Sequence, residues 1–316
     1  MTRGRISYVS ISGTLVVLAL LIGAMFSCGK TKPRVVVPIT PLQSLVNSDT
    51  TLTLFHRMLI QANETGLLAD QSITLLIPTN AALRQSGFSD TTIDSSGAYI
   101  IDRMLRFQYI TPAATPDSAG YQAFPTLLGF SIHGMRDAAG HTYFNGVMTG
   151  GGTTGDAIAV GKALVFRING VIPAARDSLV DLFGLDSSLS IAAELFRRTN
   201  LYDSLLLSGN YTLLAPVNNA FRQAGYDSVG AIDSADINTL IQLAENQVLK
   251  GIYFTNTFSN TGVITSLGGG AVTVSSSGGH YQFAGAGNTT PANWLSGNQQ
   301  SGSSLAVHRI DQVISP

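Results

Sequence analysis

One segment occurs twice in this chain. "TLLIPTNAALRQSGF" occupies residues 74–88, and "TLLAPVNNAFRQAGY" occupies residues 212–226. A second pair, "VFRINGVI" at 165–172 and "VHRIDQVI" at 307–314, follows in the same order. Because both the opening and the closing segment recur, the pattern predicts a duplicated structural unit. The two predicted domains span residues 39–174 and 175–316.

Each half has the sequence pattern of an α+β domain. Apolar residues three or four apart predict two short helices in 41–70 and again in 178–207. The apolar strand that follows should end at Pro78 or Pro216, because proline cannot donate to a sheet ladder. Asn80 and Asn218 are then predicted to cap the next short helix. A longer helix (97–110 and 234–254) and glycine-rich alternating segments (131–148 and 262–285) complete each half, the latter as antiparallel strands.

The N-terminus has the features of a targeting segment. Arg3 and Arg5 precede an apolar run at 11–26, and Ser27 and Cys28 follow. This arrangement resembles a bacterial lipoprotein signal, residues 1–28, with Cys28 as the lipidated residue. The alternative is an uncleaved signal anchor. Residues 29–38 are predicted to be a tether, which would leave the protein exported and lipid-anchored in the cell envelope.

The expected location is the outer membrane, facing the periplasm or the cell surface. The residues after Cys28 are basic, "GKTKPR", so the sequence leaves the face of the membrane open.

Composition excludes some functions. Charged residues make up 12% of the chain and the net charge is −1, so no basic surface is available for nucleic acid. The single cysteine excludes an internal disulfide. The five histidines have no accompanying carboxylate cluster, and no Gly-x-Ser-x-Gly elbow is present, so we expect no metal, no cofactor and no catalytic residue.

The repeated segments resemble the two signature segments of the fasciclin domain. Thr-Leu-Leu-x-Pro-x-Asn is followed about ninety residues later by Arg-Ile-Asn/Asp-x-Val-Ile, twice in the chain. The resemblance implies a wedge of two packed β-sheets with a collar of helices in each half. It also implies adhesion at a cell surface, association with matrix or glycans, and no catalysis.

The same resemblance suggests one set of binding residues. Many family members carry Tyr-His in the middle helical region, a pair linked to partner binding. The matching positions here are Phe107-Gln108 and Asn246-Gln247, so this chain lacks the histidine in both copies. We retain these four positions as candidates.

Aromatic residues in a polar stretch supply the other candidates. Trp294, Tyr281 and Phe283 lie within residues 278–304, among Gly, Asn, Gln and Ser. Aromatic faces beside amides and hydroxyls suit contact with sugars or proteins. The alternative is that these rings only fasten a long loop to its own domain.

The sequence therefore predicts a non-catalytic envelope protein that binds a glycan, matrix component or protein. An envelope scaffold that organises other proteins is the second hypothesis, and a hydrolase is the third.

Overall fold

The structure is a computed structural model that describes residues 38–69, 71–150, 157–207, 209–258, 262–277 and 280–315. The chain divides into a segment Met1–Ile39 and a compact unit Thr40–Pro316, and the compact unit is described below. The predicted signal with Cys28, and nearly all of the predicted tether, lie outside the described residues. Within the described ranges, no helix is both long and apolar enough to cross a membrane.

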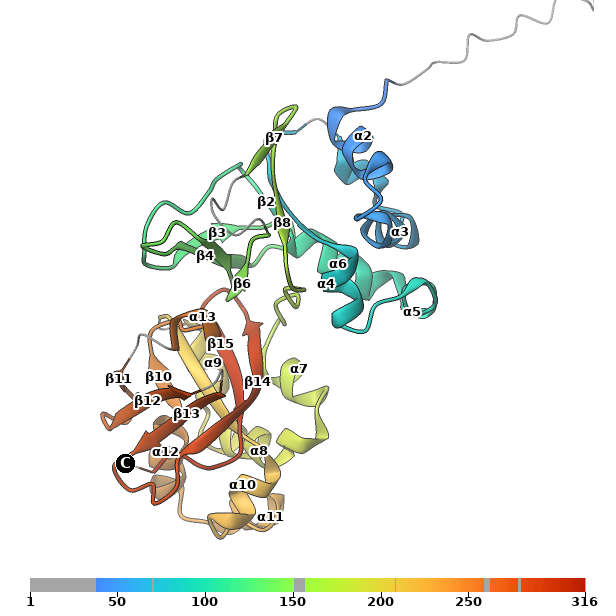
Figure 1. The fold of residues 1–316 in the computed structure, drawn as a ribbon. Helices are drawn as coiled ribbons and strands as arrows, with labels where there is room; N and C mark the ends of the chain where they lie inside the picture. The colour runs from blue at the N-terminus through green and yellow to red at the C-terminus, as the bar shows by residue number, and fades with distance from the viewer. Residues whose placement is uncertain are drawn as a thin grey trace, which may run out of the picture. The chain divides into compact units, whose positions relative to one another are not determined.

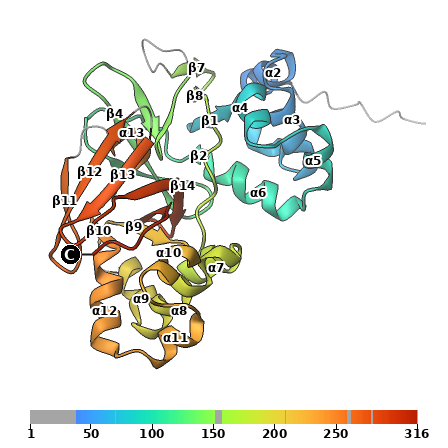
Figure 2. The same ribbon diagram turned by 60° about the horizontal axis from the view of Figure 1, so that its bottom comes forward.

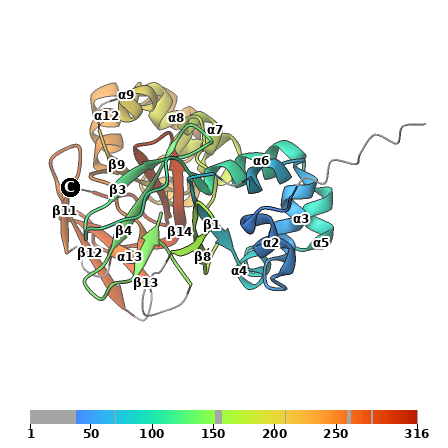
Figure 3. The same ribbon diagram turned by 90° about the horizontal axis from the view of Figure 1, so that it is seen from above.

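Short helices open each half of the compact unit. Those of the first half are α2 (Pro41–Ser48), α3 (Thr53–Gln61), the 3-10 turn η1 (Thr65–Leu68), α4 (Asn80–Gln85), α5 (Asp90–Ser95) and α6 (Ala98–Phe107). Those of the second half are α7 (Leu179–Gly184), η2 (Ser187–Leu189), α8 (Ser190–Arg198), α9 (Leu201–Leu207), α10 (Asn218–Gln223), α11 (Val229–Ser234), α12 (Ile237–Asn246) and α13 (Thr255–Phe258). The helices of each half gather beside its sheet (Figures 2 and 3).

Strands form the rest of each half. The first half contains β1 (Thr74–Pro78), β2 (Tyr109–Ile110), β3 (Gln122–Pro125), β4 (Ser131–Arg136), β5 (Thr142–Phe144), β6 (Val147–Met148), β7 (Ile158–Val160) and β8 (Ala163–Ile168). The second half contains β9 (Tyr211–Pro216), β10 (Val248–Lys250), β11 (Val263–Thr265), β12 (Ala271–Ser277), β13 (His280–Gly285), β14 (Ala292–Ser301) and β15 (Leu305–Ile310). β1 and β9, the strands of the two opening segments, end at Pro78 and Pro216, as predicted.

The two halves share one strand order. Figure 1 shows the strands of both halves. In the second half it is β10-β9-β15-β14-β13-β12-β11, and an isolated bridge, Leu249↔Ser266, links the two ends. In the first half the order is β2-β1-β8-β7 in one sheet and β3-β4-β5-β6 in the other. The bridges Ile110↔Thr126 and Thr149↔Ile168 join these two sheets into the same circuit. β7 corresponds to the last residues of β14, because Ile158 lies opposite Val165 as Gln299 lies opposite Val307. The structure therefore confirms two similar α+β units.

The repeated opening and closing segments are neighbours in space. β1 pairs in parallel with β8, placing Leu75 opposite Val165, and β9 pairs in parallel with β15, placing Leu213 opposite Val307. These four side chains are buried. The two motifs that are farthest apart in each unit thus form its central strand pair.

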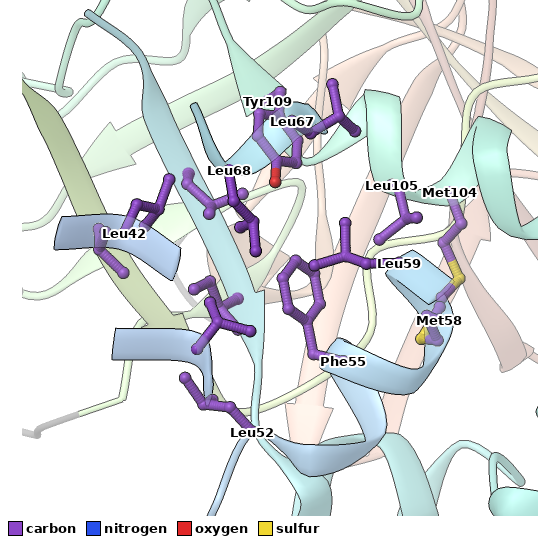
Figure 4. Packing of buried hydrophobic residues seen from close by; sticks show 14 of the residues in the cluster. Leu42, Leu52, Phe55, Met58, Leu59, Leu67, Leu68, Met104, Leu105 and Tyr109 are labelled. Carbon is purple, nitrogen blue, oxygen red and sulfur yellow. The ribbon is translucent and has the colours of Figure 1, made fainter. Parts of the chain in front are cut away.

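Each half has its own hydrophobic cores. One pair of clusters draws its buried residues from Leu42 through Ala175, and another pair draws them from Leu179 through Ile314. In the first half, Phe55 and Leu59 of α3 point into the cluster between the helices and β1 (Figure 4). Burial of this apolar surface is the main favourable contribution to folding.

The asparagine of the opening segment does not cap the helix that it begins, so that prediction was wrong. The N-cap of α4 is Thr79, whose hydroxyl accepts a hydrogen bond from Ala82 N. Asn80 instead reaches α3, where its Oδ1 accepts from Leu54 N at 2.9 Å and its Nδ2 donates to Thr50 O at 2.9 Å.

Asn218 makes the same contacts in the second half. Its Oδ1 accepts from Ile191 N at 2.9 Å, and its Nδ2 donates to Ser187 O at 2.9 Å. The residues at the N-cap positions of α3 and α8 are both leucines, which offer no side-chain cap. Each asparagine therefore satisfies backbone groups at the start of a helix that lies far earlier in the chain.

The closing segment adds an ion pair to this arrangement. Arg167 of β8 pairs with Asp49, and Arg309 of β15 pairs with Asp186 at 3.0 Å. Both aspartates lie just before the helix that the asparagine caps. In each unit, the start of one helix, α3 or α8, therefore contacts both repeated segments: the asparagine of the opening segment and the arginine of the closing segment.

We predict that Asn80→Ala destabilises the protein by about 1 to 3 kcal/mol, because the buried backbone donor Leu54 N and the partly buried acceptor Thr50 O lose their partner. Asn80 is 8% exposed, whereas Asn218 is half-buried, so Asn218→Ala should cost less. Denaturant unfolding followed by circular dichroism measures both. Asn238→Ala, at an exposed position of α12, is the matched control. Equal stability of Asn80→Ala and the control would contradict the assignment.

Candidate functional site

The candidate residues at the end of the middle helices are buried. Phe107 and Gln247 have no exposed surface, Gln108 is 1% exposed, and Asn246 is 7% exposed. Side chains at such positions cannot contact a partner in this conformation. The structure therefore corrects the prediction that these four residues bind a ligand.

The two glutamines instead tie the middle helices to the closing segments. Gln108 Nε2 donates to Ile172 O at 3.1 Å, and Gln247 Nε2 donates to Ile314 O at 3.0 Å. Gln247 Oε1 also accepts from Ile314 N at 2.9 Å, whereas Gln108 Oε1 has no partner in the structure. At the positions where relatives were expected to carry histidine, this chain uses amides for backbone hydrogen bonds.

The aromatic candidates lie on strands, not in a long loop. Tyr281 and Phe283 belong to β13 and Trp294 to β14. Phe283 is fully buried against Phe258, with ring centroids 5.1 Å apart, so its prediction as a contact residue is corrected as well. Tyr281 and Trp294 are half-buried and pack edge to face, 6.0 Å between centroids. Of the three, only these two keep solvent-accessible surface.

A buried histidine lies beneath Trp294. The indole Nε1 donates to His308 Nδ1 at 3.2 Å, and His308 Nε2 donates to Tyr253 O at 2.9 Å. Its ring also packs edge to face on Phe258, with 4.9 Å between centroids. Burial lowers the pKa of His308 to about 4, although the hydrogen bond to Tyr253 O opposes the shift. His308 is therefore neutral at pH 7 and serves as an internal acceptor and donor.

Two other histidines, His133 and His141, have hydrogen-bond partners within the fold. His133 of β4 is 2% exposed and its Nε2 bonds to Ser303 O at 2.7 Å. His141 Nδ1 lies 3.0 Å from Asp137 Oδ2, within one turn. Among the described residues, no group of three or more His, Cys, Asp or Glu side chains is arranged to hold a metal ion.

Buried polar groups also connect the two halves. Gln300 of β14 donates to Ser131 O at 2.6 Å and accepts from Asn145 Nδ2 at 2.8 Å. Beside them, Tyr121 packs edge to face on Phe254, with 5.3 Å between ring centroids. Because Asn145 and Gln300 are buried and hydrogen-bonded, they favour one specific contact between the halves.

The sequence reasoning missed the exposed apolar residues. Tyr99 and Ile100 of α6 are 68% and 60% exposed, and they border a cavity of about 340 Å³. A signal was present in the sequence, because Tyr99, Ile100 and Ile101 are consecutive. One face of a helix can bury only part of such a run, and here Ile101 is the buried residue.

We predict that acidification weakens the fold through His308. The pKa of this group is 6.5 when unfolded and about 4 when folded, so the unfolded chain binds the proton more readily. The contribution of His308 to the free energy of unfolding is fully present above about pH 6.5. It is lost as the pH drops toward 4 and below, and the loss from this group is up to about 3 kcal/mol. Denaturant unfolding at a series of pH values measures the slope.

A variant separates this histidine from other acid-sensitive groups such as His133. In His308→Gln, the amide can replace both hydrogen bonds without titrating, so the loss between pH 6.5 and 4 should be smaller than in the natural protein. Trp294 is the only tryptophan, so its fluorescence reports the same contact directly. Identical pH profiles for the two proteins would contradict the prediction.

Comparison with known proteins finds a family similarity in the second half of the chain. The model of the fasciclin domain matches residues 187–316. Among solved structures, the chain is similar to a FAS1 domain pair from the insect cell adhesion molecule fasciclin I, at 13% identity and a TM-score of 0.39. That match covers 84% of this chain and 97% of the other. No curated protein matches the sequence. Residues 187–316 are therefore similar to the fasciclin domain, and the first half of the chain repeats their strand order.

Proposed function

We propose that this protein is a non-catalytic adhesion or ligand-binding protein of the cell envelope. The match of residues 187–316 to the fasciclin domain carries the proposal, since such domains are typically adhesion modules without catalytic activity. The partner would be a glycan, a matrix component or a protein. Two similar units on one chain would increase avidity for a polymeric partner that reaches both.

Two buried histidines have structural roles. His308 and His133 are buried with backbone acceptors, and their neutral forms are favoured by burial. These groups stabilise the fold in the manner expected of structural histidines. Of the predicted contact residues, Trp294 and Tyr281 remain as candidates because each keeps some solvent-accessible surface.

Attachment to the envelope is proposed to occur through Cys28. The charged start, the apolar run and the single cysteine of residues 1–28 support a lipid anchor. A proline-containing segment, residues 29–38, would then separate the folded units from the membrane. The outer membrane is the proposed site.

We predict that Cys28→Ala abolishes lipid attachment. Cells grown with an alkyne-tagged fatty acid should label the natural protein and not the variant, because Cys28 is the only thiol. Ser27→Ala, which keeps a small residue before the cysteine, is the control and should remain labelled. A natural protein that stays in the membrane without label, with residues 1–28 intact, would favour the uncleaved anchor.

Adhesion to an external partner requires exposure on the cell. Protease added to intact cells should therefore digest the protein, while a periplasmic marker stays intact. Protection from protease would contradict the adhesion proposal.

Binding of residues 29–316 to glycan and matrix arrays then tests recognition itself. Trp294→Tyr should weaken binding if the half-buried indole contributes. Copurification with a fixed envelope protein, and no binding on the arrays, would favour a scaffold.

A further inference from the structure

The groove beside α6 has the properties of a site for a small amphipathic molecule. Its volume is about 340 Å³, near the lower end of the range for small-ligand pockets. Its apolar walls come from three segments of the chain, represented by Phe88 after α4, Tyr99 and Met104 of α6, and Val171 and Pro173 after β8. Two arginines, Arg103 and Arg176, complete the lining.

The two arginines differ in what they contact. Arg103 Nη2 donates to Ala175 O at 2.7 Å and to Asp177 Oδ1 at 2.8 Å, and its guanidinium lies 5.8 Å from the centre of the Tyr99 ring. This arginine is therefore already neutralised. The side chain of Arg176 has no hydrogen-bond or ion-pair partner among the described residues. It is half-buried, so part of its charge lies at the edge of an apolar groove, and the carboxylates of Asp177, Asp181 and Asp186 line neighbouring cavities without forming an ion pair with it.

We propose that this groove binds a single-chain fatty acid, with its carboxylate on Arg176 and its alkyl chain along Tyr99, Ile100 and Met104. A guanidinium and a carboxylate form a charge-assisted, planar hydrogen-bonded pair. The small volume favours one alkyl chain over the two chains of a phospholipid. This proposal goes beyond adhesion and does not depend on it.

The lining also discriminates against an extended peptide. A peptide would bring backbone N–H and C=O groups into contact with side chains that are mainly apolar. Apart from the two arginines, only Ser86 and Tyr99 among the lining residues carry a polar side-chain group. Unpaired backbone groups are costly in such surroundings, whereas an alkyl chain has none.

Calorimetric titration of residues 29–316 with decanoate and dodecanoate tests the apolar part of the site. This fragment retains all the described cores, which begin at Leu42. Each added methylene should raise affinity about fourfold until the groove is full. Equal affinity for the two acids would overturn the proposal, as would failure of both to bind.

Head-group variants test the charged part. Dodecanoate should bind at least tenfold more tightly than dodecanol, because only the acid pairs with Arg176. Arg176→Gln should reduce dodecanoate binding by about tenfold and leave dodecanol unchanged, and Arg176→Lys should restore part of the difference. Arg222→Gln, at an exposed position of α10, is the matched control. Equal binding of acid and alcohol to the natural protein would overturn the carboxylate assignment.

Ile100→Ser locates the alkyl chain. It should weaken both dodecanoate and dodecanol several-fold, whereas Val263→Ser, which is 62% exposed on β11, should change neither. Both positions are exposed, so unfolding transitions should stay close to that of the natural protein. An apolar tripeptide with a free carboxylate that binds more tightly than dodecanoate would overturn the choice of a fatty acid. These titrations use isolated protein, so their failure is distinct from a negative result in adhesion.

Discussion

Each unit depends on one asparagine that reaches back to an earlier helix. Asn80 and Asn218 follow directly after a central strand, and each satisfies backbone groups at the start of α3 or α8. The strand before each asparagine pairs in parallel with the closing strand. Since the closing strand also sends an arginine to an aspartate beside the same helix, strand pairing and helix position are fixed together. The repeated sequence is thus explained by a shared structural requirement.

Local patterns predicted the duplication, the α+β class and the strand ends at Pro78 and Pro216. They failed at Asn80 because capping rules consider neighbours in sequence, whereas its helix partner Leu54 lies 26 residues away. Similarly, the resemblance located Gln108 and Gln247 in the middle helices without indicating their burial. Their amides bond to backbone that is more than sixty residues distant, which a sequence window does not contain.

The candidate aromatic residues show a different limit of the sequence. Residues 262–285 were predicted to form antiparallel strands, and β13 does carry Tyr281 and Phe283, but the pattern did not indicate that Phe283 faces the core. The groove beside α6 was also missed, because Phe88, Tyr99 and Val171 come from three separate segments that only the fold brings together.

The parallel pairing of first and last strands affects how each unit is made. During synthesis, β9 leaves the ribosome almost ninety residues before β15, the strand that lies between it and β14. Until β15 arrives, the middle of the sheet is missing, and β9 can pair only with β10. Such long-range pairing carries a large loop-closure cost and slows folding. Each unit therefore becomes complete only when its closing segment is added, and a shortened chain would lack an internal strand of the sheet instead of a dispensable tail.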